Sequence, residues 1–456
     1  MISHVFTELK NRIAGEVVVP DSPEFDGPDQ LFNQVGSSAI TVYVQSTNDV
    51  VTTISFARKH DLPLSVRSGG HGLSRQAMHN GGLVLDLTHI QQIELLDAEQ
   101  HLVRIGAGAR WGDVAKALAV HGLALSSGDT KQVGVGGLTL GGGIGWLVRT
   151  YGLTIDSLQA AELVTADGRI MRVSAEEHPH LFWAIRGGGG NFGVVTSFDF
   201  RAQPCHTIIG GSVIYDASEA EAVLTAWASS IHKAPEALNS TIELFPGFGS
   251  QIPPQITVKL CYAGEDQAAA KKAIEPFLHS GIVRSQNIQK MPYAAMLEDE
   301  VSPPPGLRLI DHGGFLKTMD REALSTLAAH YGQPGRPIAQ IRALGGAMAR
   351  VSPQATAFAH RENEAVVYMA TFAPSSVTEE EARQIRQAAW QPLALMSSGA
   401  YVNFVSEVSE KSVTDSYPEE TYTRLARIKA SYDPDNVFAQ NHNILPAERR
   451  LRHYGK

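Results

Sequence analysis

The residues that most strongly suggest a binding or catalytic role lie in clusters of glycine. The chain has 42 glycines, and they concentrate at positions 69–72, 106–108, 134–145 and 187–193. Glycine tolerates positive φ and carries no Cβ, so such clusters indicate backbone that turns sharply or closely approaches a bound group. One cluster, SGGHG, places His71 between glycines. That setting lets a flat ring system come close to the imidazole, which the other histidines of the chain do not offer.

The same glycine turns also suit phosphate. Successive backbone N–H groups form a concave nest for an anion, and the segments VRSGGHG and VGVGGLTLGGGIG offer such groups without lysine, as glycine turns at the ends of strands. Either segment alone is also explained by tight turns. The chain has no GxxxxGK[ST] motif, which excludes a P-loop. Gly188, Gly190 and Gly193 match GxGxxG, but a predicted helix precedes them and a strand follows, the reverse of a dinucleotide-binding unit.

Regular elements must hold these turns in place. Alternating and helical hydrophobic spacing predicts strand, helix and strand over 40–67, with Thr47 or Asn48 as the helix cap. The sequence LQAAELVTADGRIMRVS predicts a hairpin that turns at Asp167 and Gly168. Further strands are predicted at 81–87, 101–108 and 192–202, and helices at 111–121 and 176–185.

The pattern changes near Pro204. From 206 to 395, strand-like runs such as IIGGSVIYD and PQITVKLCYA alternate with predicted helices at 219–231, 266–278 and 378–390. This pattern is typical of an antiparallel sheet covered by helices. The last part of the chain carries a predicted helix from Tyr417 to Tyr432. We therefore expect an α+β protein in which residues 1–205 and 396–456 form one domain and residues 206–395 form the other.

Composition excludes several classes of function. The net charge is −9, the pI is about 6.0 and there is no basic run, so nucleic acid is not an expected partner. The apolar stretches are short and interrupted by glycine, so no membrane association is expected. The first twenty residues lack the features of a secretory signal, which predicts a cytoplasmic protein. Cys205 and Cys261 form no disulfide framework, and His178 and His180 have no second ligand pair, so no metal is expected.

Taken in order, the motifs resemble the FAD-linked oxidases of the vanillyl-alcohol-oxidase type, in their berberine-bridge-enzyme-like branch. The chain is similar to the bacterial 6-hydroxynicotine-oxidase-like members. The landmarks are SVRSGGHG, GLVLDL, GVGGLTLGGGIGWLVRTYGLTID, LVTADG, LFWAIRGGGGNFGVVTSF, YVNF and RLARIKASYDPDNVFAQNHNI. The resemblance implies a two-domain PCMH-type FAD-binding fold with an antiparallel-sheet substrate domain.

The resemblance also implies where FAD would bind. His71 would be joined covalently to the 8α carbon of the flavin, and Val195 would lie near the adenine. The residues that would wrap the pyrophosphate are Arg67, Ser68, Gly69, Gly70 and Gly72. Those that would line the ribityl and diphosphate chain are Gly136, Gly137, Gly142, Gly143, Gly145, Asn191 and Gly193. Those that would face or approach the isoalloxazine are Tyr401, Asn403, Asn441 and Asn443.

Two departures from the family pattern carry weight. Many relatives add a second covalent bond from a cysteine shortly before GVGG, and here that position is Thr130. Threonine cannot form a thioether, so a single attachment through His71 is expected. Ile144 also stands where plant relatives often carry an active-site tyrosine, so their catalytic arrangement cannot be transferred whole.

The implied reaction is oxidation of a C–H that bears a hydroxyl or an amine on a small organic substrate. Hydride passes to FAD, and O2 reoxidises the flavin to give hydrogen peroxide. Tyr401 is the candidate base or substrate-orienting residue, and Val133 is the candidate gate for oxygen beside the flavin. The alternatives are a dehydrogenase, an oxidative cyclase of secondary metabolism, and a flavin-binding protein without turnover.

The middle region supplies further polar and aromatic residues that could reach a substrate. Arg342 or His312 would be the candidates to stabilise a Tyr401 phenolate. The sequence does not choose among them, and it leaves the substrate and the oligomeric state open. The full set is Tyr262, Tyr293, Asp311, His312, Arg342, Tyr368 and Trp390.

Overall fold

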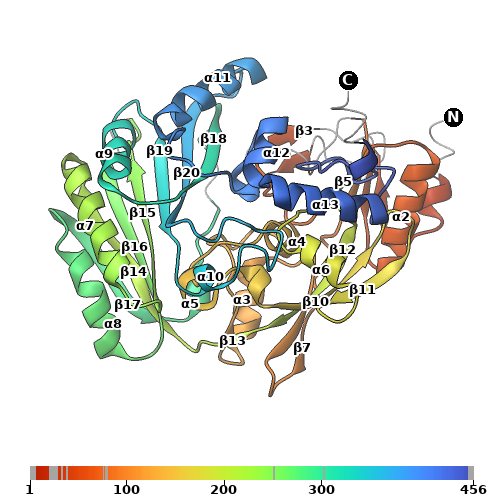
Figure 1. Cartoon of the computed structure of the whole chain (residues 1–456), viewed down its shortest axis with the longest axis horizontal. Coiled ribbons are helices and arrows are strands. Elements are labelled where there is room, and N and C mark those ends of the chain that lie inside the picture. Colours follow the sequence, from red (N-terminus) through yellow and green to blue (C-terminus); the bar gives the residue numbers. More distant parts are fainter. Residues whose placement is uncertain are drawn as a thin grey trace.

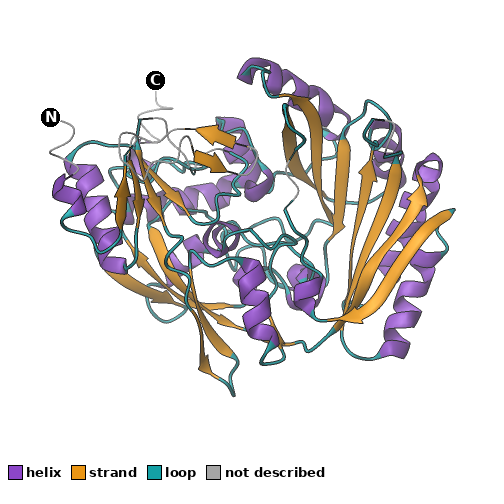
Figure 2. Cartoon of the chain, turned by 180° about the vertical axis from the view of Figure 1, so that it is seen from behind, coloured by secondary structure: helices purple, strands orange, loops and turns teal. Residues whose placement is uncertain are grey.

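The computed structural model describes residues 7–19, 29–31, 34–36, 40–74, 77, 81–249, 252–300 and 303–449. Two lobes lie side by side, with short helices and loops between them (Figure 1). One lobe is built from several small sheets, and the other from one broad sheet whose helices lie on the outer side (Figure 2). Residues 1–6 and 20 of the N-terminal segment, in which no secretory signal was expected, lie outside the described residues.

The first lobe begins with a four-stranded sheet in the order β1 (Glu16–Val18), β4 (Ile40–Tyr43), β6 (Leu83–Asp86) and β5 (Leu64–Arg67). Strands β4 and β5 both run parallel to β6, and α2 (Thr47–Lys59) connects them. The predicted strand, helix and strand are therefore confirmed. The cap is Ser46, whose hydroxyl accepts a hydrogen bond from the Asp49 N–H at 3.2 Å, one residue before the predicted position. Strand β5 ends directly at the SGGHG turn.

A five-stranded antiparallel sheet completes the first lobe. Its order is β11 (Ile170–Ser174), β10 (Leu158–Val164), β12 (Val194–Arg201), β8 (Leu102–Gly106) and β7 (Ile93–Asp97). Val164 pairs with Ile170 across the predicted hairpin turn, which confirms it. The first lobe also contains the helices α3 (Trp111–Ala119) and α6 (Pro179–Ile185). Two further sheets have two strands each: β2 (Asp29–Leu31) pairs with β3 (Gln34–Gly36), and β9 (Leu123–Ala124) pairs with β13 (Gln203–Pro204).

The second lobe is one antiparallel sheet, as the sequence predicted, and it has seven strands. Its order is β17 (Val283–Met291), β14 (Ile208–Asp216), β16 (Gln255–Ala263), β15 (Leu238–Phe245), β19 (Ile338–Ala343), β20 (Ala365–Pro374) and β18 (Leu307–Leu316). Its helices are α7 (Ala220–Lys233), α8 (Gln267–Ile274), α9 (Arg321–His330) and α11 (Glu379–Trp390). Trp227 of α7 and Leu327 of α9 are fully buried against sheet residues such as Ile242. The opposite face of the sheet is turned toward the first lobe (Figure 2).

Short helices lie where the lobes meet. They are α4 (Val135–Leu140), α5 (Val148–Tyr151) and α10 (Ala347–Arg350), and the chain closes with α12 (Glu410–Ser416) and α13 (Glu419–Tyr432) on the first lobe (Figure 1). The remaining turns of 3-10 helix are η1 (Thr154–Asp156), η2 (Ala217–Glu219), η3 (Glu275–Leu278), η4 (Tyr293–Ala295), η5 (Gln391–Leu393) and η6 (Val402–Phe404).

Two sequence predictions need correction here. VGVGGLTLGGGIG is not turn throughout, because its middle forms α4; Val135 and Thr139 of this helix are fully buried, so packing outweighs the low helix propensity of glycine. The last helix starts at Glu419 and not at Tyr417, because Pro418 precedes it in an extended conformation and a separate helix ends at Ser416.

Both boundaries of the predicted division, 205/206 and 395/396, fall in connections between elements, and the division into domains stays a prediction. Arg149 ties the lobes together from α5, donating to the carbonyl oxygens of Leu238 at 2.9 Å and Leu344 at 2.7 Å. Within the residues the structure describes, no helix is long and apolar enough to cross a membrane.

Candidate active site

A cavity of about 500 Å³ lies between the lobes. The first lobe contributes the turn after β5, part of α4, and the 189–193 turn with the first two residues of β12. The C-terminal part of the chain adds residues 401–404 and 438–442. The second lobe contributes Gln340 of β19, Tyr368 of β20 and the loop residues 298–300. Segments far apart in the sequence therefore enclose one space.

The turn after β5 is held tightly against the loop before α4. The Ser68 hydroxyl donates to the Ala107 carbonyl at 2.6 Å. A Cβ added at Gly69 would lie 2.3 Å from the backbone nitrogen of Gly134, and Gly70 has φ +73°. A side chain at Gly69 would force the two segments apart, and one at Gly70 would require a strained left-handed backbone, which explains both glycines. The turn is thereby fixed with its backbone at the cavity wall.

His71 lies at the cavity wall with a partner from the other lobe. Its side chain is 13% exposed, and Nε2 lies 3.0 Å from Glu300 Oε2. Burial lowers the pKa of His71, and the nearby Glu300 carboxylate opposes that shift. The ring is thus largely withdrawn from solvent and oriented by a carboxylate.

Tyr401 is 3% exposed and accepts three hydrogen bonds at its hydroxyl oxygen. The donors are the backbone N–H groups of Gly143 at 3.1 Å and Ile144 at 3.3 Å, and Asn403 Nδ2 at 3.0 Å. Burial raises the pKa of Tyr401 and these donors oppose it, so the phenol is neutral at physiological pH. Neither of the predicted phenolate partners binds it directly, since Arg342 donates to Asp129 and Thr241 and His312 packs on Trp390.

Tyr368 faces the same cavity with the opposite hydrogen-bond sense. Its hydroxyl donates to Asp311 Oδ2 at 3.3 Å across the β18 and β20 pair. Burial raises the pKa of Asp311 to about 6, although Ser406 and Arg386 oppose the shift. Burial and the adjacent carboxylate together raise the pKa of Tyr368 well above its ordinary value. A carboxyl that titrates near neutrality is suited to exchange a proton through the tyrosine.

Three of the carboxylates that line the cavity, Asp129, Glu298 and Asp299, are paired with arginine or lysine. Arg342 and burial act oppositely on Asp129, and the net effect holds the pKa of that carboxyl below its ordinary range. Glu298 lies 2.6 Å from Lys259, and Asp299 lies 3.0 Å from Lys131. Among the described residues that line the cavity, none is lysine or arginine. A bound anion would therefore be held by backbone N–H groups, as the glycine turns suggested.

The structure brings most of the predicted site residues to the cavity wall. Those at the wall are Ser68, Gly69, Gly70, His71, Gly72, Val133, Gly136, Gly137, Asn191, Gly193, Val195, Tyr401, Asn403 and Asn441. Those behind it are Arg67, Gly142, Gly143, Gly145 and Asn443.

Local packing explains the residues behind the wall. Arg67 forms a buried ion pair with Asp86. A Cβ at Gly145 would lie 1.4 Å from the Ser127 carbonyl oxygen, so this glycine is required for close packing. Gly143 presents its N–H to the Tyr401 hydroxyl. These residues lie behind the cavity wall and hold the segments that form it.

Of the polar and aromatic residues named in the middle region, only Tyr368 lies at the wall, with Asp311 behind it. Both residues were candidates that the sequence did not distinguish from the others, and Glu300 and His442 were not among the candidates. Burial lowers the pKa of His442 to about 4, so this wall residue is neutral. Its position between Asn441 and Asn443 was the signal that could have identified it.

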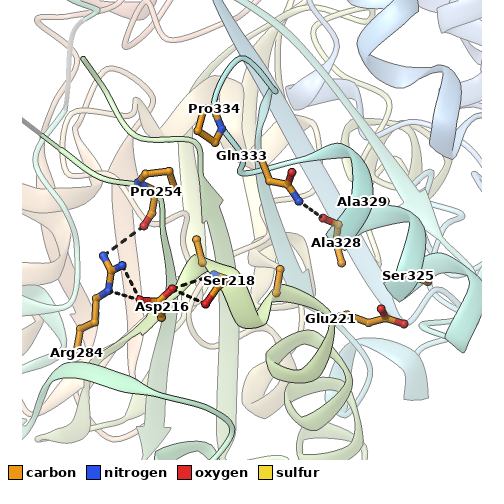
Figure 3. A pocket seen from close by; sticks show the side chains of 12 residues that line it. Asp216, Ser218, Glu221, Pro254, Arg284, Ser325, Ala328, Ala329, Gln333 and Pro334 are labelled. Carbon is orange, nitrogen blue, oxygen red and sulfur yellow. Dashed lines mark hydrogen bonds and ion pairs between the residues drawn. The ribbon is translucent and has the colours of Figure 1, made fainter. Parts of the chain in front are cut away.

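A second hollow, of about 620 Å³, lies on the surface of the second lobe (Figure 3). Its principal charged groups satisfy each other, since Arg284 lies 2.7 Å from Asp216 and Ser218 donates to the same carboxylate at 2.7 Å. It has neither a glycine turn nor a buried polar group that lacks a partner. The cavity between the lobes is therefore the candidate active site.

The chain matches known protein families and relatives. Residues 38–174 match the FAD binding domain family, and residues 400–445 match the berberine and berberine-like family. The chain is 30% identical to (R)-6-hydroxynicotine oxidase of Paenarthrobacter nicotinovorans, over 98% of this chain and 99% of that protein.

Solved structures match equally well. The crystal structure of 6-hydroxy-D-nicotine oxidase from Arthrobacter nicotinovorans superposes with a TM-score of 0.84 at 30% identity, covering 95% of this chain and 98% of that one. Glucooligosaccharide oxidase from Acremonium strictum, which carries a 6-S-cysteinyl, 8α-N1-histidyl FAD, shares the fold with a TM-score of 0.81 at 23% identity, covering 97% of this chain and 99% of that one.

Proposed function

The chain belongs to the FAD-linked oxidoreductases of the berberine-bridge-enzyme-like branch, and from that premise we propose that it is an oxidase with FAD joined covalently to His71. Its substrate is a small organic molecule with a C–H that bears a hydroxyl or an amine. The observation that carries the proposal is the placement of His71, the glycine turns and Tyr368 around one cavity. The fold and the FAD-dependent oxidoreductase class follow from the family.

The cavity fits FAD in several respects. A Cβ added at Gly72, Gly137 or Gly190 would meet nothing within 4 Å, so these glycines leave room along the wall for a bound group. The Tyr417 hydroxyl and Asn441 Oδ1 are buried there and have no hydrogen-bond partner among the described residues. Buried polar groups seldom lack partners in a complete site. We propose that the glycine turns hold the pyrophosphate and that the C-terminal segment covers the flavin.

FAD, when bound, supplies the hydride-accepting chemistry of the reaction. In our proposal Tyr401 orients the substrate, because its oxygen already accepts three N–H donors and its own proton remains available for donation. Tyr368 receives the substrate's O–H or N–H proton and passes its own proton to Asp311. Of the two roles expected for Tyr401 from the sequence, orientation is thus favoured over proton removal.

The covalent bond is expected at His71 alone. Thr130 lines the cavity where relatives with a second bond carry cysteine, and its hydroxyl donates to Asp129 at 3.2 Å. Threonine offers no thiol for a thioether. Val133 lines the same stretch of wall and remains the proposed gate for O2.

A peroxide assay across alcohols, amines and sugars tests the proposed function. An oxidase consumes O2 and forms hydrogen peroxide in a one-to-one ratio with oxidised substrate. A dehydrogenase would turn over only with an added acceptor, and an oxidative cyclase would form peroxide only with a substrate that closes a ring. If no member of the panel bleaches the flavin under anaerobic conditions, the non-catalytic alternative replaces the proposal.

A further inference from the structure

The side chain of Glu300 contacts His71 from the opposite lobe. The carboxylate comes from the second lobe, 229 residues along the chain, yet its Oε2 lies 3.0 Å from His71 Nε2. Both side chains line the cavity, and they are 13% and 25% exposed. A pair this far from bulk solvent holds its geometry better than a surface ion pair.

The segment that carries Glu300 is itself fixed. The Glu300 N–H donates to Gln132 Oε1 at 3.0 Å, and the Glu298 N–H donates to the Asp129 carbonyl at 2.7 Å. The Lys131 N–H returns a bond to the Glu298 carbonyl at 2.9 Å. Residues 298–300 are therefore bound to the first lobe by their backbone as well as by side chains. This attachment sets the position of the carboxylate independently of His71.

A carboxylate at Nε2 decides which imidazole nitrogen is the nucleophile. Because Glu300 accepts a hydrogen bond from Nε2, the ring proton lies on Nε2 and the lone pair on Nδ1. When Nδ1 forms a fourth bond, the imidazole becomes cationic and the Nε2 proton becomes acidic. Glu300 is then the adjacent acceptor. Arg110 also influences His71 and disfavours a positive charge on it, which increases the need for the carboxylate.

We propose that Glu300 is the positioning residue and proton acceptor for covalent attachment of FAD to His71, an inference that rests on the proposed function. The bond that forms joins Nδ1 to the 8α carbon of the flavin. One C8α–H bond and the Nε2–H bond break as protons, and Glu300 takes the latter. The two electrons released at the 8α carbon reduce the flavin ring, and O2 reoxidises it, taking both electrons and both protons as hydrogen peroxide.

The test follows covalent incorporation over time. Apoprotein from riboflavin-limited cells is mixed with FAD in air, samples are denatured in acid, and flavin fluorescence is measured on the separated polypeptide. Glu300→Gln keeps the size of the side chain but cannot take the proton, so incorporation should slow by at least about tenfold. Glu300→Ala should be equally slow, and added formate should restore much of its rate.

A matched control separates this role from a general effect of losing a histidine–glutamate pair. His232 lies 3.1 Å from Glu364 on the second lobe, away from the cavity, and Glu364→Gln should incorporate flavin at the wild-type rate. Non-covalent FAD affinity, measured in the His71→Ala background, should change little in Glu300→Gln. If affinity falls as much as incorporation does, Glu300 serves binding and the inference fails.

Two further outcomes are distinguishable. Wild-type incorporation in Glu300→Gln overturns the inference and leaves the covalent proposal intact. Absence of covalent flavin in the wild-type protein overturns the covalent proposal and the inference together.

Discussion

Tyr368 and Tyr401 line the same cavity but use their hydroxyls in opposite ways. Tyr401 accepts from three N–H groups, whereas Tyr368 donates to Asp311. A hydroxyl that accepts is held ready to donate its proton, and one that donates to a carboxylate is ready to receive one. The two residues therefore predict different kinetic defects.

Replacing Tyr368 by phenylalanine should slow flavin reduction by the substrate about 10²- to 10⁴-fold, because the proton acceptor is lost. Replacing Tyr401 by phenylalanine should mainly raise KM. It should also cost about 1–3 kcal/mol of unfolding free energy, because buried N–H donors lose their acceptor. Anaerobic stopped-flow reduction and chemical denaturation measure these effects. Equal reduction rates in Tyr368→Phe and the wild type would assign proton removal to another residue.

Asp311 predicts the pH dependence. Its pKa is raised by burial to about 6, from an ordinary value of 3.8. Proton transfer needs the carboxylate, so the rate of flavin reduction should fall as pH drops below about 6. Asp311→Asn should be slow at every pH and lack this acid limb. Persistence of the limb in Asp311→Asn would contradict the assignment.

The same shift has a stability consequence of defined sign. Because the folded state binds the proton more tightly than the unfolded state, ionisation of Asp311 destabilises the fold as pH rises from about 3.8 to about 6. The loss is complete above that window and amounts to about 3 kcal/mol at most. Asp311→Asn should therefore melt at a higher temperature than the wild type at about pH 8. Near pH 4 the two proteins should melt at similar temperatures.

Val133 carries the prediction on oxygen. It lies on the cavity wall, and its carbonyl accepts a hydrogen bond from the Trp111 N–H at 3.0 Å. Val133→Leu should narrow the space at this wall, so reoxidation by O2 slows while reduction by substrate is nearly unchanged. Val195→Leu, the same change on the proposed adenine side, is the control. If the stopped-flow rate of flavin reoxidation by O2 is the same in Val133→Leu and the wild type, Val133 does not control oxygen access.

At the scale of elements, one buried lysine fastens the end of the chain to the glycine turn. Lys429 of α13 is fully buried, and its Nζ donates to the carbonyls of Asn191 and Phe438 and to Asp433, each at 2.9 Å. Asp433 in turn accepts from the N–H groups of Val437 and Phe438. The segment that covers the cavity is thereby attached to the turn that precedes β12.

Lys429→Met should cost about 3–5 kcal/mol of unfolding free energy, because it leaves the buried Asp433 carboxylate without a compensating positive charge. The double variant with Asp433→Asn should recover part of that loss. Lys411→Met is the control, since Lys411 is 81% exposed in its pair with Asp415 and should change stability by less than about 1 kcal/mol. Urea unfolding measures all three. If the unfolding free energy falls no more in Lys429→Met than in the control, Lys429 does not attach the C-terminal segment to the turn before β12.

Elements with clear periodicity were predictable, and those without it were not. The β10 and β11 hairpin was predictable from its two strand-like runs and from the turn residues Asp167 and Gly168. Strand β17 was missed because most of its side chains are exposed and polar at the sheet edge. Strand β18 was missed because Gly313 and Gly314 interrupt it, and both glycines are explained by close packing against residues of the C-terminal part of the chain and α11.

Some residues of the candidate site were likewise predictable from the sequence, and others were not. His71 and the glycine turns could be named from the sequence because glycine clusters mark local backbone geometry. Glu300 was not, since its role depends on residues 298–300 aligning with residues 129–132, a contact between lobes that leaves no local pattern. Tyr368 could be named but not chosen, because only the register of β18 and β20 places it beside Asp311.

At the scale of the whole molecule, buried arginines lock the two lobes around the cavity. Arg342 of β19 donates to the Ile144 carbonyl at 3.2 Å and pairs with Asp129. Arg361 is fully buried and lies 2.7 Å from Asp156. With Arg149, these side chains give the interface fixed hydrogen bonds and little freedom to slide. A cofactor held at this interface would contact both lobes at once.

In the proposed enzyme the flavin is bonded to the protein at His71. The most direct test of this bond is the mass of the acid-denatured peptide that contains His71, isolated from air-grown wild-type protein. We expect a peptide that is heavier by the mass of one FAD less the two hydrogens lost. The added mass should be absent in His71→Ala, and Thr130 should be unmodified in the wild-type protein. An unmodified His71 peptide, with all the flavin in the acid supernatant, would contradict the covalent proposal.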